Sequence, residues 1–171
     1  MSATITEYAS DGMEIAAKSR LVWIPTVADI DAISVTEFNT GTAFECATTA
    51  FGLVPEVTAR EIRKLCDVIT RRRVGSRSWS VEALVIDIED PQATNALLDL
   101  MSADSEGVLV HRPGLEHDAA AAAAQKYEAV KVTVASQALV PLSSDEGSVY
   151  QATHELYVLE KNDGLFSELV A

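Results

Sequence analysis

The sequence has few of the residues and patterns that would assign it a chemistry. Its 171 residues include two cysteines, Cys46 and Cys66, whose spacing matches no zinc or redox motif. We expect both to be reduced, small apolar side chains. No apolar stretch is long enough to span a membrane. Residues 1–20 contain no continuous apolar segment, so we expect no secretory signal, with synthesis and folding in the cytoplasm.

Catalytic motifs are missing as well. The chain has no phosphate-binding loop, dinucleotide fingerprint, nucleophile elbow or His-Glu-x-x-His pattern. We therefore expect no enzymatic activity, no catalytic residue, no cofactor and no metal. His154 lies in a predicted strand beside Glu155, and we interpret it as a structural histidine rather than a general base.

Two groups of acidic and histidine residues are candidate metal ligands. The first comprises Asp87, Glu89 and Asp90. Asp90 has a simpler interpretation as a helix cap, since Pro91 follows it. The second group comprises His111, Glu116, His117 and Asp118. Because nothing in the sequence fixes the geometry of this second group, we interpret it as a solvated loop.

Basic residues are scarce, and most of them lie in one segment. The chain has 13 Lys and Arg against 26 Asp and Glu, for a net charge of −13. Seven of the basic residues lie in 60–77: Arg60, Arg63, Lys64, Arg71, Arg72, Arg73 and Arg77. With two carboxylates, this segment carries +5 and the rest of the chain −18. Such a field repels phosphate, so a general nucleic-acid binder is excluded, whereas an acidic surface on another copy is a suitable partner.

Alternating or short apolar segments predict β-strands separated by polar turns. The expected strands are residues 20–25, 44–51, 78–88, 107–112, 127–140 and 148–159. Residues 26–42 read as a long connection, 143–148 as a hairpin turn, and 165–171 as a tail. Residues 91–101, capped by Asp90, form the one clear helix.

The basic segment is harder to interpret. Ile62, Leu65 and Ile69 have helical spacing, which predicts a short amphipathic helix in part of residues 57–77. The arginine run at 71–73 is typical of an exposed loop. Taken together, the pattern predicts a mainly β fold in a single domain, an antiparallel sandwich or partly closed barrel with one flanking helix.

The chain resembles the major tail proteins, or tail tube proteins, of long-tailed bacteriophages. The resemblance spans about residues 20–160 and rests on 20–29 (RLVWIPTVAD), 35–42 (VTEFNTGT) and the predicted strand at 44–51. It extends to Leu65-Cys66-Asp67 and to the alanine-rich segment before 131–134 (KVTV). The arginine run and the regular helix at 91–101 depart from the family pattern.

The resemblance implies a virion protein of 171 residues in one tail-tube-like domain that forms hexameric rings, which stack into a tube. Other tail proteins would be partners, and double-stranded DNA would pass through the lumen without specific binding. It also implies an N-terminal arm at about 1–19 and an assembly loop at about 55–77, whose basic residues would contact the adjacent ring. The protein would reside in the virion tail after assembly in the host cytoplasm.

Three alternatives remain open at this point. A tail terminator or tail-completion protein would form one ring and stop. A small-ligand-binding or enzymatic β-barrel would use the loop from His111 to Asp118. A DNA-binding protein would use Arg60 to Arg77, against the overall charge and without interleaved aromatic residues.

Overall fold

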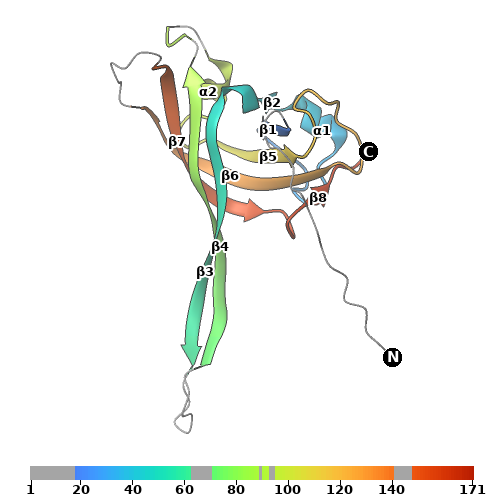
Figure 1. Cartoon of the computed structure of the whole chain (residues 1–171), viewed down its shortest axis with the longest axis vertical. Helices are drawn as coiled ribbons and strands as arrows, with labels where there is room; N and C mark the ends of the chain where they lie inside the picture. The colour runs from blue at the N-terminus through green and yellow to red at the C-terminus, as the bar shows by residue number, and fades with distance from the viewer. Residues whose placement is uncertain (1–17, 63–70, 89, 93–94, 141–147) are drawn as a thin grey trace, which may run out of the picture.

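The computed structural model describes residues 18–62, 71–88, 90–92, 95–140 and 148–171, and this part of the chain is mainly antiparallel β-structure (Figure 1). Its strands are β1 (Ser19–Ile24), β2 (Thr42–Ala43), β3 (Thr48–Ile62), β4 (Arg71–Ile88), β5 (Glu106–Pro113), β6 (Lys126–Leu139), β7 (Tyr150–Lys161) and β8 (Ser167–Glu168). The helices are α1 (Val35–Thr40) and α2 (Ala96–Leu100), with a 3-10 turn, η1 (Glu45–Ala47). The mainly β prediction is confirmed.

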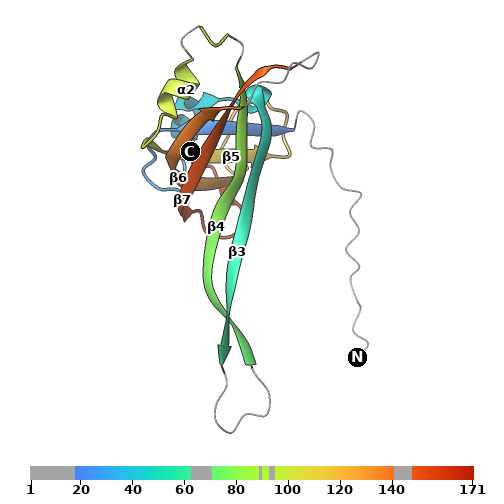
Figure 2. The same ribbon diagram turned by 90° about the vertical axis from the view of Figure 1, so that its left-hand side faces the viewer.

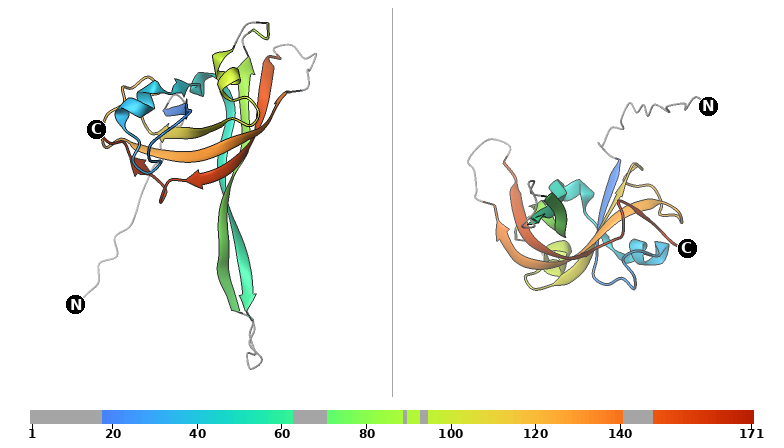
Figure 3. Two further views of the ribbon diagram at one scale, coloured as in Figure 1. Left: turned by 180° about the vertical axis from the view of Figure 1, so that it is seen from behind. Right: turned by 90° about the horizontal axis from the view of Figure 1, so that it is seen from below.

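The strands form one eight-stranded sheet in the order β2-β1-β5-β6-β7-β4-β3, with β8 paired to β6. The sheet is strongly curved, as the views in Figure 3 show, but it is not closed into a barrel, because β2 and β3 lie at its two edges. Closure would satisfy the edge hydrogen bonds within one chain, whereas this sheet leaves its edges available.

The central strands β1, β5 and β6 carry apolar side chains on both faces, so the sheet has two cores. One face buries Leu21, Trp23, Leu109 and the valines of β6 with residues of β4, β7 and α2. The other buries the alternate residues of β1 and β5 with Phe38 of α1 and Tyr127. Alternation places successive side chains on opposite faces, so both sets come from the same short strands.

Helix α1 covers the second core and is fixed at its start by a capping box. The hydroxyl of Ser34 accepts from the backbone N–H of Glu37, and the Glu37 carboxylate accepts from the N–H of Ser34. The buried Tyr127 hydroxyl donates to the carbonyl of Ile30 and accepts from the N–H of Ile33. The connection at 26–42, expected to be irregular, is therefore an ordered cover that includes a helix.

Two other local predictions differ from the structure. The helix expected at 91–101 is confined to α2, and its cap is Asn95, whose side chain accepts from the N–H groups of Leu97 and Leu98. Asp90 instead accepts from the N–H of Gln92 in a turn. The strand expected at 44–51 begins only at Thr48, because residues 45–47 form the 3-10 turn.

Strands β3 and β4 extend far beyond the rest of the sheet as a two-stranded arm (Figures 1 and 2). Their pairing continues from the body outwards to Ile62 and Arg71. Residues 55–62 and 71–77, expected to be loop or helix, are thus paired strands. Leu65, Ile69 and the rest of 63–70 lie outside the described residues, as do residues 1–17 of the N-terminal arm expected at about 1–19.

Candidate assembly surface

The arm has two chemically different sides, which follow from its strand register. Directly opposed residues of an antiparallel ladder project to the same side. The pairs Pro55–Trp79, Val57–Arg77 and Ala59–Val74 therefore define one side, and it continues the core-facing side of the Leu53–Val81 pair. We call these arm positions the apolar side.

The opposite side of the arm is polar. It carries Val54, Glu56, Thr58 and Arg60 from β3, and Ser80, Ser78, Ser76 and Arg73 from β4. A contact of 3.5 Å between Ser78 Oγ and Glu56 Oε2 agrees with this assignment. We call these positions the hydroxyl-arginine side.

A β-bulge shifts the alternation of β4 by one residue, so that Val74 lies on the same side of the arm as Arg77. Two residues of β4, Gly75 and Ser76, lie opposite the single residue Thr58. The Thr58 hydroxyl accepts from the Ser76 N–H at 3.0 Å and lies 2.8 Å from the Ser76 hydroxyl. A Cβ at Gly75 would lie 2.8 Å from Thr58 Oγ1 and 2.9 Å from its carbonyl oxygen, so glycine is required there.

The predicted basic residues are divided between these sides rather than gathered on one. Arg60 and Arg73 are cross-strand partners on the hydroxyl-arginine side, and both are exposed. Arg77 is exposed on the apolar side. The backbones of Arg71 and Arg72 pair with Ile62 and Glu61. Arg63 and Lys64 lie outside the described residues, so their position is an untested expectation.

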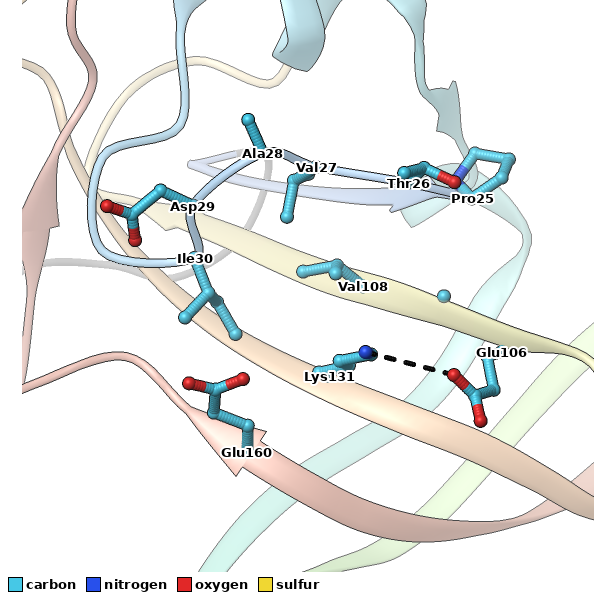
Figure 4. Close-up of a pocket in the computed structure, with 11 residues that line it drawn as sticks. Pro25, Thr26, Val27, Ala28, Asp29, Ile30, Glu106, Val108, Lys131 and Glu160 are labelled. Carbon is cyan, nitrogen blue, oxygen red and sulfur yellow. Dashed lines mark ion pairs between the residues drawn. The ribbon is translucent and has the colours of Figure 1, made fainter.

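A pocket with more acidic than basic residues, opposite in charge to the arm, lies on the body and has a volume of about 530 Å³ (Figure 4). It is formed between the segment after β1 and the strands β5, β6 and β7. Its charged residues are Asp29, Glu106, Lys131 and Glu160. Lys131 Nζ is 3.8 Å from Glu106 Oε2, whereas Asp29 and Glu160 lie on the side of the pocket away from Glu106, with Ile30 between them. Such a surface attracts cationic side chains.

The candidate metal ligands do not converge. Within the described ranges no three His, Cys, Asp or Glu side chains are arranged to hold a metal ion. His111 Nε2 is 2.7 Å from Ser19 Oγ, and burial lowers the pKa of His111 although the charge of Glu128 opposes this. Asp87 accepts from the side-chain amide of Gln151 at 2.8 Å. Glu89 is outside the described residues.

The remaining predicted side chains have structural surroundings. Burial lowers the pKa of His154, whose Nε2 lies 3.2 Å from the Gln137 amide nitrogen. Glu116 contributes its backbone carbonyl, not its carboxylate, to a contact with Arg112. Cys46 is a free, exposed thiol, and Cys66 lies outside the described residues.

Arg112 is a residue that the sequence interpretation missed. It is fully buried and donates to the Gln125 side chain and to the carbonyls of Glu116 and Ala119. Its guanidinium lies 5.7 Å from the centre of the Phe38 ring. Arg112 thereby holds the alanine-rich loop against the second core. The sequence contains a pattern that could have predicted this burial. Arg112 lies two residues after Val110 and four after Val108, so strand alternation places its side chain on the same inward-facing side.

No helix in the described part of the chain is both long and apolar enough to cross a bilayer. Comparison with functionally curated proteins finds no match. Among solved structures, the chain is similar to one in the cryo-EM structure of the anti-feeding prophage (AFP) baseplate. The TM-score is 0.58 at 11% sequence identity, over 91% of this chain and 96% of that one, which is a likeness of fold.

A family model described as phage tail tube protein matches residues 12–162, which include the first core, the second core apart from Leu169, and the whole β3–β4 arm. The chain therefore belongs to the phage tail tube protein family and is a structural protein of the phage tail.

Proposed function

We propose that this chain is a tail tube subunit that polymerises with copies of itself, forming hexameric rings that stack into the tube through which DNA leaves the virion. The work is mechanical, done by shape, strand pairing and charge, with no catalytic step and no cofactor. The subunit assembles in the host cytoplasm, together with other tail proteins, and ends in the virion tail.

The observation that carries this proposal is the arm. An isolated two-stranded ribbon is marginally stable in water, because it has no core to bury its apolar side chains. The arm exposes Val57 and Val74 and has no part of its own chain packed over its end among the described residues (Figure 2). A second subunit is the simplest partner that would cover it.

The open sheet edges add a second argument. β3 is a 15-residue edge strand, whereas β2, at the other edge, has two residues. Unpaired edges invite strand addition from another chain, and closed rings of subunits remove them. The rings proposed here would use these edges within a ring and the arm between rings.

The net charge of the chain supports the proposal that DNA passes through the tube without adhering to its wall. Outside residues 60–77 the chain carries −18, so most of its surface repels phosphate. The basic arm would instead meet an acidic surface of a neighbouring subunit, such as the one lined by Asp29 and Glu160. Arg60, Arg63, Lys64, Arg71, Arg72, Arg73 and Arg77 are the residues proposed for this inter-ring contact.

Negative-stain electron microscopy of the purified chain over a concentration series tests the proposal. Long hollow tubes of uniform diameter are the expected result. Single rings that never stack would instead identify a tail terminator. If only globular particles formed at every concentration, self-assembly of the chain alone would be contradicted.

A further inference from the structure

The apolar side of the arm does not end where the arm meets the body. It continues through Trp79 to Leu165 in the turn after β7. These two residues line a corner pocket of about 420 Å³ together with Arg77, Lys161, Asn162, Asp163 and Gly164. Leu165 is 65% exposed. An apolar strip therefore runs from Val74 along one side of the arm into a concave corner of the body.

We propose that this strip, formed by Pro55, Val57, Ala59, Val74, Trp79 and Leu165, is the surface on which a second copy of the chain docks, and that the hydroxyl-arginine side remains outside this apolar contact. The inference rests on the proposed self-assembly and specifies which side of the arm carries it.

Several exposed apolar residues gather on this strip, rather than one alone. Val57 and Val74 are 57% and 61% exposed, and the adjacent Pro55 and Ala59 are also exposed. All four share one side of the ladder, while the serines and threonine share the other. Single apolar residues scattered over a surface are ordinary, but four gathered on one side of a ladder, with Arg77 among them, mark an interaction site.

The corner has the charge that suits a second copy. The ammonium of Lys161 is 4.8 Å from the centre of the Trp79 ring and 3.4 Å from Glu128 Oε1, so a carboxylate of the same chain already pairs with it. Arg77 is exposed beside it. Asp163 of the same chain also lines this corner. Because the chain outside 60–77 carries −18, another copy can supply further carboxylates for Arg77.

The two sides of the arm should contribute differently to the binding of a second subunit. Ion pairs between exposed side chains contribute little and weaken with salt. Burial of valine side chains is favourable at any ionic strength. The apolar side should therefore supply most of the affinity between subunits, while Arg60 and Arg73 on the other side set the rate and register of binding, on which the yield of tubes also depends.

Serine substitutions on the two sides of the arm test this. The double variant Val57→Ser/Val74→Ser removes two exposed valines from the strip, and Val54→Ser removes the one valine of the hydroxyl-arginine side, which is 37% exposed. We expect the double variant to need about tenfold or more protein to form tubes. Val54→Ser should polymerise like the wild-type chain. Equal polymerisation of the double variant and the wild type would overturn the inference.

A labelling experiment gives an independent readout that does not depend on a destabilised variant. In a Cys46→Ser/Cys66→Ser background, a cysteine replacing Val74 should react with a maleimide in the monomer and be at least tenfold slower in assembled tubes, as a buried thiol is shielded from reagent. A cysteine replacing Val54 should keep most of its reactivity. Undiminished labelling at position 74 in tubes would refute the docking surface while leaving tube formation intact. Failure of the wild-type chain to polymerise would refute both.

Discussion

Arg60 and Arg73 lie directly opposite one another in the β3–β4 ladder, so two exposed guanidinium groups share one side of the arm. Like charges at directly opposed positions destabilise a strand pair. The Arg60–Arg73 pair therefore carries a local electrostatic cost in the monomer. An acidic partner surface would remove that cost.

Neutralising the arginine run should therefore impair assembly without unfolding the chain. The triple variant Arg71→Gln/Arg72→Gln/Arg73→Gln is expected to remain a folded monomer and to polymerise poorly, as measured by sedimentation and electron microscopy. The matched control replaces the same three residues by lysine, which keeps the charge but loses the planar fork. Tubes of normal length and yield from the glutamine variant would contradict the proposed role of these arginines.

Gly107 and Trp23 form a contact that leaves no room for a side chain. A Cβ at position 107 would lie 2.2 Å from Cζ2 of Trp23. We expect Gly107→Ala to lower the free energy of unfolding by about 2–3 kcal/mol, because the core would be overpacked. Gly52→Ala is the control, since its Cβ would come no closer than 3.6 Å to Glu82. Chemical denaturation measures both, and an unchanged unfolding midpoint for Gly107→Ala would show that the ring moves freely.

Lys161 and Glu128 form an ion pair that is largely shielded from water, with side chains 4% and 17% exposed. Lys161→Met keeps the aliphatic stem against Trp79 but leaves Glu128 unpaired. The expected loss of unfolding free energy is about 3 kcal/mol, the range found when one member of a buried pair is removed. In a double-mutant cycle, Glu128→Gln should recover part of this loss. Strict additivity of the two substitutions would mean that the ion pair contributes nothing.

Glu37 should make the stability of the chain depend on pH in the acid range. Hydrogen bonds from the N–H groups of Ser34 and Ala28 hold the pKa of the Glu37 carboxyl below its ordinary value of 4.5. The stabilisation is thus complete above 4.5 and is lost as the pH falls through the lower folded-state pKa.

Thermal unfolding across this pH range tests the role of Glu37. At neutral pH, Glu37→Gln should cost about 0.5 kcal/mol, because the amide oxygen can still accept from the Ser34 N–H but the charge in the first turn of the helix is lost. Its melting temperature should also fall less steeply with acid than that of the wild-type chain. Identical pH profiles for the two proteins would assign the acid sensitivity to other carboxyl groups.

The central strands could be predicted from the sequence because alternation is a local signal. Residues 107–112 and 127–140 nearly match β5 and β6. Helix α2 was overestimated because Pro91 and good helix formers suggested an early start, whereas Asn95 competes for the backbone N–H groups and starts the helix later.

The arm was missed for a physical reason. The sequence of the arm is rich in charged and hydroxyl residues, which is not typical of a strand that packs on a core. Only one side of the arm is apolar, and no core of the chain packs against it. A weak signal was present in the alternation of Ser76, Ser78 and Ser80 with larger residues, which extends the strand predicted at 78–88 towards the tip. The pairing of β3 with β4 is a non-local property that single-strand patterns do not contain.

The single arm also gives the molecule a direction. One end of the subunit carries β3 and β4 well beyond the body, and no second arm is present among the described elements (Figure 1). When such subunits join by a contact between unlike surfaces, the resulting filament is polar, with arms exposed at one end and receiving surfaces at the other. The two ends would then grow at different rates and would require different proteins to cap them.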